Sequence, residues 1–277
     1  MANSRLPTVS VIVPTFNRGW ILKKAIDSVC AQRFTDFELI VVDDGSSDET
    51  PDLLRVYGDR IRAVRQANRG VSAARNAGIR QARGELIALL DSDDTWLPGK
   101  LAAQVAFFDA LPKARICQTE EIWMRNGVRV NPGRRHRKPS GMIFERSLAL
   151  CLVSPSAVMM RRSLFDEVGG FDESLPACED YDLWLRIAWK YPIHLIDRPL
   201  IVKRGGHADQ LSRMPGLDKY RIRSICRLLE SGCLSSGQRE AATAVLKNKC
   251  TIYAQGCRKR GKTEQARFYR NLPEQYR

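Results

Sequence analysis

Residues 86–94, Leu-Ile-Ala-Leu-Leu-Asp-Ser-Asp-Asp, place three carboxylates directly after five apolar residues. An apolar run of this length is typical of a strand buried in a sheet. Carboxylates that lie this close repel one another and raise each other's pKa values unless a cation lies between them. Clusters of oxygen ligands suit Mg²⁺ or Mn²⁺, so the stretch favours a metal site. The alternative is a solvated acidic turn in which Asp94 or Thr95 caps a helix that follows Pro98.

The sequence around this stretch alternates between strand and helix patterns. We expect strands at residues 9–13, 38–42, 61–65 and 85–90, and helices at 19–32, 50–58 and 71–82. Strands separated by helices of this length form a parallel sheet. Such sheets bind ligands beyond the carboxyl ends of their strands. Here those ends carry the polar residues 14–17, 43–46 and 91–94, which predicts a pocket at that edge.

The alternation fades after about residue 113. Asn126-Gly127 indicates a hairpin turn, and the basic residues up to Lys138 indicate an exposed loop. Further helices are expected at 178–191, 217–231, 238–258 and 263–271. We therefore predict an α/β chain whose main domain covers residues 1–208, followed by a basic helical extension over 209–277. Within the domain, a nucleotide-binding half covers about 8–112 and an acceptor half about 113–208.

The composition is that of a globular protein with reduced cysteines. The 277 residues are 44% hydrophobic and 27% charged, and no run of 18 apolar residues occurs. The first residues lack the apolar core of a signal peptide, so we expect a cytoplasmic protein. The 8 cysteines contain no Cys-x-x-Cys pair, which argues against a zinc site and for free thiols.

Positive charge is the unusual feature of the composition. The net charge is +14, and residues 209–277 hold 15 Lys and Arg against 6 Asp and Glu, a net +9. A second basic patch covers residues 125–138. Basic surfaces attract nucleic acid, anionic lipid headgroups or phosphorylated substrates. No nucleic-acid recognition motif appears, so nucleic acid is not an expected partner, and the absence of G-x-G-x-x-G and Walker A sequences argues against dinucleotide and P-loop chemistry.

Six motifs follow one another in register along the chain. They begin with Val-Ile-Val-Pro-Thr-Phe-Asn-Arg at 11–18 and continue at 41–48, 68–78, 91–94, 169–173 and 179–185. In this order and spacing they closely resemble glycosyltransferase family 2, the inverting nucleotide-sugar transferases of the GT-A fold. The resemblance covers about residues 8–207. It implies a Rossmann-like, mostly parallel sheet flanked by helices, and the transfer of a sugar from a nucleoside-diphosphate sugar to an acceptor hydroxyl.

The resemblance also implies a donor site at the first two strand ends. Pro14, Thr15 and Asn17 would border the base and ribose of the nucleotide. Asp44 would hydrogen-bond the base, most often uracil in this family, which points to a UDP-sugar. Asp43 and Asp44 also fit a turn that closes a strand, since Asp-Gly pairs commonly do that. One of the two carboxylates can serve the turn while Asp44 faces the ligand.

The metal and the leaving group are assigned in the same way. Asp91 and Asp93 match the family's Asp-x-Asp signature, in which Mn²⁺ or Mg²⁺ bridges the diphosphate to Asp93 and stabilises its developing charge. Asp91 would hold ribose or complete the metal shell, and Asp94 would support the site or cap a helix. Arg75 and Asn76 would brace the nucleotide side of the pocket. The alternative for these two is a solvated helix face.

The acceptor side of the resemblance lies in the last motif. Asp180 would act as the general base that takes the proton from the acceptor hydroxyl, with Glu179 beside it. Both carboxylates also fit a simple role at a helix N-terminus. Trp184 lies one helical turn further on, where it would stack on a sugar ring or pack in the core. His207 would be a further metal ligand or an exposed loop residue.

We therefore expect a metal-dependent, hexosyltransferase-type enzyme that acts in surface polysaccharide or glycan assembly on a glycan or lipid-linked acceptor. The basic tail and the loop at 125–138 would dock it on the anionic inner membrane face, hold a phosphorylated lipid-linked acceptor, or remain merely solvated. One alternative is a nucleotidyltransferase of the same fold, although its Gly-rich basic loop after the first strand is missing. Another is a non-enzymatic basic protein that binds nucleic acid.

Overall fold

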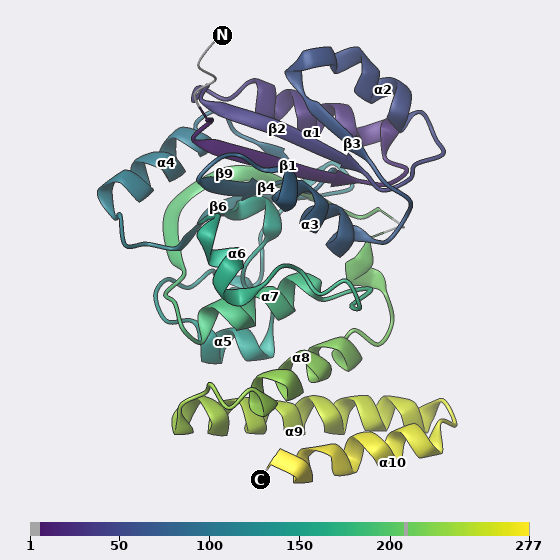
Figure 1. Ribbon diagram of the computed structural model, residues 1–277. Coiled ribbons are helices and arrows are strands. Elements are labelled where there is room, and N and C mark those ends of the chain that lie inside the picture. The colour runs from purple at the N-terminus through teal and green to yellow at the C-terminus, as the bar shows by residue number, and fades with distance from the viewer. Residues whose placement is uncertain (1–5, 208–209, 277) are drawn as a thin grey trace.

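The computed structural model of the chain describes residues 6–207 and 210–276. Within these ranges a nine-stranded sheet forms the centre of the molecule, with helices packed on both of its faces (Figure 1). The strand order is β3-β2-β1-β4-β8-β6-β9-β5, and β7 pairs with β6. The predicted α/β class with a sheet flanked by helices is confirmed.

The first half of the sheet is parallel. Its strands are β1 (Val9–Thr15), β2 (Phe37–Asp43), β3 (Arg62–Arg65) and β4 (Leu86–Leu89). The helices between them are α1 (Gly19–Cys30), α2 (Thr50–Tyr57) and α3 (Val71–Gln81). β2 and β4 both pair with β1 in parallel, and β3 pairs with β2 in the same sense. The expected alternation of strands and helices is confirmed, and the carboxyl ends of β1, β2 and β4 meet at one edge.

The second half mixes parallel and antiparallel pairs. It contains β5 (Thr95–Trp96), β6 (Ile116–Arg125), β7 (Val128–Val130), β8 (Val158–Arg161) and β9 (His194–Gly205), with helices α4 (Lys100–Ala110), α5 (Phe144–Ala149), α6 (Ser163–Val168) and α7 (Glu179–Ala188). Asn126 and Gly127 both have positive φ and close the β6–β7 hairpin, as predicted. Neither Asp94 nor Thr95 caps the following helix, because α4 begins only at Lys100 after Gly99.

Side chains of the central strands alternate between two apolar layers. Val11 and Val13 of β1 pack with α1, α2 and α4, whereas Ile12 between them packs on the other face with α3, α5 and α7. Gly78 allows α3 to lie close to β1, since a Cβ at this position would come within 2.4 Å of Ile12 Cγ2. This close packing fixes the helix that carries the Arg-Asn motif against the sheet.

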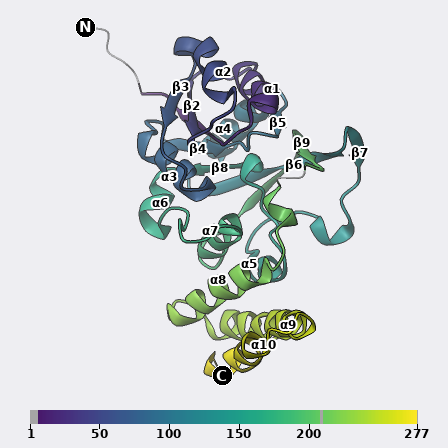
Figure 2. The ribbon, with the colours of Figure 1, turned by 90° about the vertical axis from the view of Figure 1, so that its right-hand side faces the viewer.

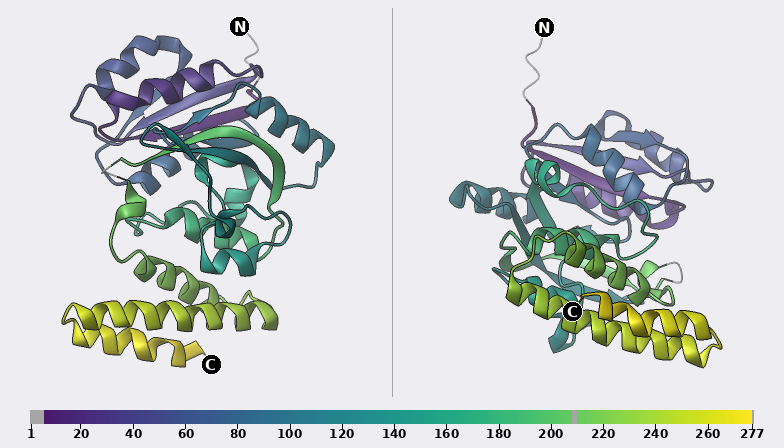
Figure 3. Two further views of the ribbon diagram at one scale, coloured as in Figure 1. Left: turned by 180° about the vertical axis from the view of Figure 1, so that it is seen from behind. Right: turned by 60° about the horizontal axis from the view of Figure 1, so that its bottom comes forward.

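Three helices follow the sheet and form a further layer: α8 (Asp218–Glu230), α9 (Ser236–Lys259) and α10 (Thr263–Asn271). Ser235 and Gln238 form a capping box that starts α9. Figure 3 shows α9 and α10 side by side along the end of the molecule. Residues of α8 and α9, such as Ile225 and Leu246, belong to the same apolar cluster as α5 and α7. The predicted domain boundary at residues 208 and 209 lies outside the described residues.

Two further expectations concern the surface of the molecule. The basic segment that ends at Lys138 is exposed as predicted, except for Lys138 itself, which is buried. Its Nζ donates to the carbonyl oxygen of Thr119 at 3.0 Å and pairs with Glu121 at 3.1 Å.

All 8 cysteines are free. Over residues 6–207 and 210–276, no helix combines the length and the apolar character that a membrane span needs.

Candidate active site

A cleft of about 680 Å³ opens at the carboxyl ends of β1, β2 and β4. Five parts of its lining come from the predicted motifs: Pro14 and Thr15 at the end of β1, Asp44 after β2, Arg75 on α3, the carboxylates after β4, and Glu179 with Asp180 at the start of α7. These segments are far apart in the sequence, and the topology brings them to one edge of the sheet (Figure 1). The cleft therefore has the position expected of a ligand site in an α/β sheet.

The two adjacent carboxylates after β2 have different roles. Asp43 Oδ1 accepts a hydrogen bond from the Ser46 amide at 2.9 Å, which closes the turn. Asp44 lines the cleft, and its Oδ2 accepts from the Gly70 amide at 2.8 Å. Its other oxygen accepts from the side chain of Gln66 at 2.7 Å. The expected division between a turn residue and a residue that faces the cleft is thus what the contacts show, and Asp44 also fixes the loop that leads into α3.

Arg75 lies at the centre of the site and is 3% exposed. One terminal nitrogen donates to Glu179 Oε1 at 2.6 Å, and the other donates to Asp91 Oδ1 at 2.7 Å. The guanidinium also lies 5.0 Å from the centre of the Phe171 ring. Burial raises the pKa of the Glu179 carboxyl, whereas the charge of Arg75 lowers it. The alternative of a solvated helix face is wrong for Arg75, because its charge is buried and paired on both sides.

The remaining carboxylates after β4 separate into two environments. Asp93 lines the cleft and lies 3.3 Å from a terminal nitrogen of Arg18, and burial together with the charge of Asp91 raises its pKa. Asp94 is 2% exposed and accepts from Ser156 Oγ at 2.6 Å and from the Arg204 amide at 2.8 Å. Burial, followed by the charge of Asp93, raises the pKa of Asp94 well above its usual value. Asp94 therefore supports the site by joining β9 to the loop after β4.

The donor atoms at this position fit a divalent cation. Asp91 and Asp93 place two carboxylates on the cleft, and their mutual repulsion is the kind that a cation relieves. Among residues 6–207 and 210–276, no three His, Cys, Asp or Glu side chains form a complete ligand set. Magnesium commonly binds through one or two carboxylates, with waters and substrate phosphates as its other ligands. A two-carboxylate site is therefore sufficient for that role.

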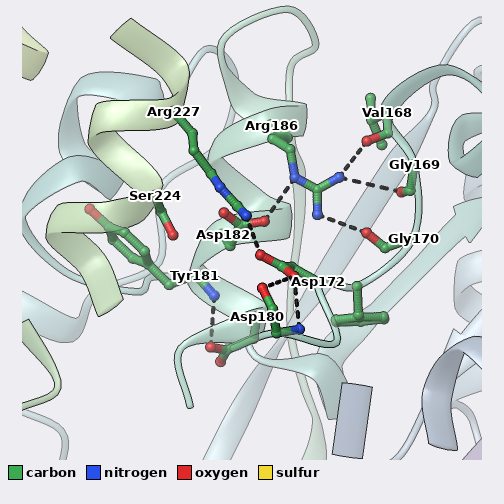
Figure 4. A network of polar contacts seen from close by, with 12 residues as sticks. Val168, Gly169, Gly170, Asp172, Asp180, Tyr181, Asp182, Arg186, Ser224 and Arg227 are labelled. Carbon is green, nitrogen blue, oxygen red and sulfur yellow. Dashed lines mark hydrogen bonds and ion pairs between the residues drawn. The ribbon is translucent and has the colours of Figure 1, made fainter. Parts of the chain in front are cut away.

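Asp180 is the second residue of α7 and lines the cleft, and both of its oxygens accept hydrogen bonds. Its Oδ1 accepts from the Tyr181 amide at 2.7 Å, a contact visible in Figure 4. The thiol of Cys151 donates to its Oδ2 at 3.5 Å. Burial, followed by the negative charge of Asp180, raises the pKa of Cys151 well above its usual value, which keeps the thiol protonated as a donor. The carboxylate is thus oriented by neighbours that carry no positive charge.

The loop before α7 is held from both sides. Arg186 of α7 pairs with Asp182 at 2.8 Å and donates to the Gly170 carbonyl at 2.8 Å (Figure 4). The Asn76 side chain accepts from the Phe171 amide at 2.9 Å and donates to the carbonyl of the same residue at 2.9 Å. Asn76 therefore braces the loop rather than the cleft wall. Phe171 of this loop packs on the Arg75 side chain, which explains why the motif at residues 169–173 belongs to the site.

The sequence did not predict a role for Glu121, Trp123 and Lys203, which also line the cleft. Burial lowers the pKa of the Lys203 ammonium, but the carboxylates of Glu121 and Asp94 more than offset this and raise it above its usual value. Trp123 donates its indole N–H to Glu121 Oε1 at 2.8 Å, and the Lys203 Nζ lies 5.5 Å from the centre of its ring. Lys203 could have been found from the sequence, because it directly follows the apolar residues Leu200, Ile201 and Val202 of a strand. A charge in such a strand requires a partner when it is buried.

Three predicted site residues lie elsewhere. Trp184 is 1% exposed and packs against Phe171 with ring centres 6.4 Å apart, so the expected stacking on a sugar is wrong. Asn17 has a φ of 51° and accepts from the Ser47 amide at 2.9 Å, and it is absent from the cleft lining. His207 packs edge-on against Trp20 at 5.0 Å and also lies outside that lining. Its role as a metal ligand stays a prediction.

The sequence matches one family over more than half of the chain. Residues 10–169 fit the description Glycosyl transferase family 2, and residues 140–220 fit Glycosyltransferase like family 2. An uncharacterized glycosyltransferase of Rickettsia felis is 32% identical over 222 residues, which cover 76% of this chain and 36% of the relative. The uncharacterized glycosyltransferase YwdF of Bacillus subtilis is 30% identical over 244 residues, which cover 80% and 89%. The chain spans only about a third of the Rickettsia felis relative.

Solved structures share the fold at low sequence identity. TarS 1-349 of S. aureus, in complex with UDP-GlcNAc, has a TM-score of 0.73 and 17% identity, and the match covers 97% of this chain and 92% of TarS. The mannosyltransferase PcManGT of Pyrobaculum calidifontis, in complex with GDP-Man and Mn²⁺, has a TM-score of 0.58 and 20% identity over 96% and 86% of the two chains. These likenesses concern the arrangement of strands and helices.

Proposed function

The chain belongs to glycosyltransferase family 2, and from that premise we propose that it transfers a sugar from a nucleoside-diphosphate sugar to a hydroxyl group of an acceptor. The observation that carries the proposal is the Arg75 bridge, which joins Asp91 to Glu179 and so brings the Asp91–Asp93 pair and the neighbouring Asp180 to one cleft. The Asp91–Asp93 pair is suited to a leaving diphosphate, and Asp180 is suited to an attacking hydroxyl. Relatives of this fold bind UDP-GlcNAc and GDP-Man, and the uracil expectation at Asp44 favours a UDP-sugar here.

The donor binds at the ends of β1 and β2 in this proposal. Pro14 and Thr15 border the nucleotide, and Asp44 faces the base from a position fixed by the amides of the loop before α3. Asp91 and Asp93 would hold Mn²⁺ or Mg²⁺ together with the diphosphate. When bound, the ion supplies Lewis-acid stabilisation of the negative charge that develops on the leaving group. The ion pair with Arg75 at 2.7 Å holds the Asp91 carboxylate in place for that task.

Asp180 acts as the general base. Its carboxylate takes the proton from the acceptor hydroxyl while that oxygen attacks the anomeric carbon and the bond to the diphosphate oxygen breaks. A single displacement of this kind inverts the configuration at the anomeric carbon. The Tyr181 amide and the Cys151 thiol fix the orientation of the carboxylate, and Glu179 next to it is occupied by Arg75. Glu179 therefore contributes to acceptor binding only through the position of Asp180.

The acceptor is proposed to be a glycan or a lipid-linked glycan of a surface polysaccharide. The three C-terminal helices provide the peripheral contact with an anionic membrane face in this proposal. Exposed cations such as Lys247, Arg258 and Lys259 lie on α9, on the side away from the apolar cluster. Such side chains each contribute about 1 kcal/mol near an anionic lipid surface.

A thermal-shift panel of nucleotide sugars, with and without Mn²⁺, tests the proposal. We expect at least one nucleotide sugar to raise the melting temperature only when Mn²⁺ is present. Asp93→Ala should lose that shift, whereas Asp180→Asn should keep it because Asp180 acts on the acceptor. Release of nucleoside diphosphate by Asp180→Asn should fall by roughly 10²–10⁴-fold. A panel without any Mn²⁺-dependent shift, or a shift that survives Asp93→Ala, would contradict the proposal.

A further inference from the structure

The β6–β7 hairpin and the turn after it carry an unusual run of cations. Residues 122–144 contain 6 Lys and Arg and no Asp or Glu. Five of these side chains are exposed, and we call them the arginine lip: Arg125, Arg129, Arg134, Arg135 and Arg137. Some exposed arginines elsewhere, such as Arg69 and Arg83, pair with carboxylates. No arginine of the lip forms an ion pair within the described part of the chain, so its positive charge is available to a ligand.

The arginine lip is continuous with the cleft. His136 and Lys138, which come from the same segment, both line the cleft. Trp123 lies at the junction, where its ring centre is 5.3 Å from that of His136. Figure 2 shows β7 and the following turn at the side of the molecule, above α8, α9 and α10. The arginine lip is therefore separate in space from the cations of α9 and α10 (Figure 2), and it reaches the cleft through His136 and Lys138, whereas Arg221 of α8 lines the cleft from another element.

The inner end of this path has the chemistry of a carbohydrate site. Glu121 holds the indole N–H of Trp123 at 2.8 Å and pairs with Lys138 Nζ at 3.1 Å, so the ring, the carboxylate and the ammonium are fixed together. An aromatic face beside fixed polar groups suits a sugar, which presents apolar C–H groups and hydroxyls. These residues face the same cleft as Asp180. We assign a sugar at Trp123 to the acceptor, because the donor is proposed to bind at the ends of β1 and β2.

We propose that the acceptor is an anionic glycan whose phosphate, sulfate or carboxylate groups lie on the arginine lip while its end unit lies beside Trp123. The proposal rests on the proposed function, because it names the class of acceptor for that site. Charge complementarity selects an anionic chain. A chain can continue from the exposed arginines past His136 into the cleft, whereas a planar layer of lipid headgroups meets only the exposed tips. The membrane contact is left to α8, α9 and α10.

Fluorescence anisotropy with two labelled hexasaccharides tests this. The probes are a heparin-derived hexasaccharide, which is anionic, and maltohexaose, which is neutral. We compare the wild type with the triple variant Arg134→Gln, Arg135→Gln, Arg137→Gln. The matched control Lys247→Gln, Arg258→Gln, Lys259→Gln removes the same charge from exposed positions of α9. We expect the lip variant to bind the heparin hexasaccharide at least 10-fold more weakly than the wild type, and the affinity of the control to change by less than 2-fold. The affinity for maltohexaose should be the same in all three proteins.

A second variant tests whether the chain reaches the cleft. Trp123→Leu should weaken heparin binding by about 3-fold or more, since it removes the aromatic face at the inner end of the path. Protection by UDP and Mn²⁺ against thermal unfolding should stay the same in every variant, which shows that the fold and the donor site are intact. If no nucleotide protects even the wild type, the proposed function fails, and the arginine lip is judged on heparin binding alone.

Several outcomes would overturn the inference. Equal losses in the lip and control variants would mean general charge attraction, and unchanged binding in Trp123→Leu would mean that the glycan stays outside the cleft. If binding to phosphatidylglycerol vesicles falls more in the lip variant than in the α9 control, the arginine lip is a membrane surface. A single-stranded oligonucleotide that binds the lip more tightly than heparin would make it a nucleic-acid surface.

Discussion

The guanidinium of Arg75 donates to the carboxylate of Glu179 at 2.6 Å and joins two motifs that are 104 residues apart. The same guanidinium holds Asp91 at 2.7 Å. Because Arg75 and Glu179 are both buried, removing one partner would leave an uncompensated buried charge, which is costly. One side chain therefore ties the loop after β4 to the start of the helix that carries Asp180. This makes Arg75 the position where stability and activity are most closely linked.

Arg75→Met should destabilise the fold in a pH-dependent way. Without the guanidinium, burial raises the pKa of Glu179 further above its unfolded value. A carboxyl whose pKa is higher in the folded than in the unfolded state destabilises the fold as the pH rises. Arg75→Met should therefore lose more stability at pH 8 than at pH 5. We expect about 3–5 kcal/mol at pH 8, measured by urea unfolding. The control Arg80→Met, an exposed position on the same helix, should change little at either pH.

Asp93 and Asp94 should separate metal dependence from stability. Asp94→Ala leaves the Arg204 amide and Ser156 without their acceptor, which should cost about 1–3 kcal/mol in urea unfolding. Asp93→Ala should cost less, because Asp93 lies at the cleft, where water can replace its ion pair with Arg18. Isothermal titration of Mn²⁺ in the presence of UDP should show the reverse order. If Asp94→Ala folds normally but no longer binds Mn²⁺, the metal ligand is Asp94, and the assignment to Asp93 is wrong.

Trp184 should affect stability and leave ligand binding unchanged. The ring is buried, and its indole nitrogen has no hydrogen-bond partner among the described residues. Trp184→Phe should therefore cost less than about 1.5 kcal/mol, whereas Trp184→Ala should cost about 3–5 kcal/mol. Urea unfolding measures both variants. Loss of nucleotide-sugar protection by Trp184→Phe with unchanged unfolding would restore the interpretation of Trp184 as a sugar-binding residue.

Lys100 predicts a second pH effect far from the site. Its Nζ donates to Gln104 Oε1 at 2.6 Å and lies 3.9 Å from the centre of the Trp96 ring. Burial lowers its pKa from 10.5 to about 7, so the unfolded chain binds the proton more tightly and wild-type stability rises with pH between these values. Lys100→Met should remove this penalty.

The expected gain of Lys100→Met is a few kcal/mol at pH 7, since one pKa unit corresponds to about 1.4 kcal/mol. The gain should shrink as the pH approaches 10.5. Chemical denaturation at several pH values measures the difference between variant and wild type. Lys24→Met, at an exposed position of α1, is the matched control. A difference that does not depend on pH would show that the lysine stays charged inside the fold.

The first half of the fold was predictable because its signals are local. Alternation places Val11 and Ile12 on opposite faces of one strand, and Gly58 ends α2 with a φ of 51°. The polar strand ends then follow from the topology of a parallel sheet. This is why Asp44, Asp91 and Asp93 were expected at the cleft, and the structure places them there.

The second half depends on contacts that no local pattern contains. β6 and β9 pair in parallel with shifts of register around Glu120, and this pairing brings Lys203 to Glu121. Trp184 shares a helix with Asp180, but the helix turns its ring toward Phe171 and away from the cleft. Spacing on a helix predicts a shared face only approximately, and the packing of the preceding loop decides which side chain is buried.

The position of α7 has a practical consequence for handling this protein. The helix is held between the sheet on one side and α8 with α9 on the other, through a single apolar cluster. Arg227 pairs with Asp172 across the same boundary, and Gln238 donates to the carbonyl of Trp189 at 2.8 Å. Heat or urea should therefore unfold the sheet and the C-terminal helices in one cooperative transition. A chain truncated before α8 would leave α7 without its outer support.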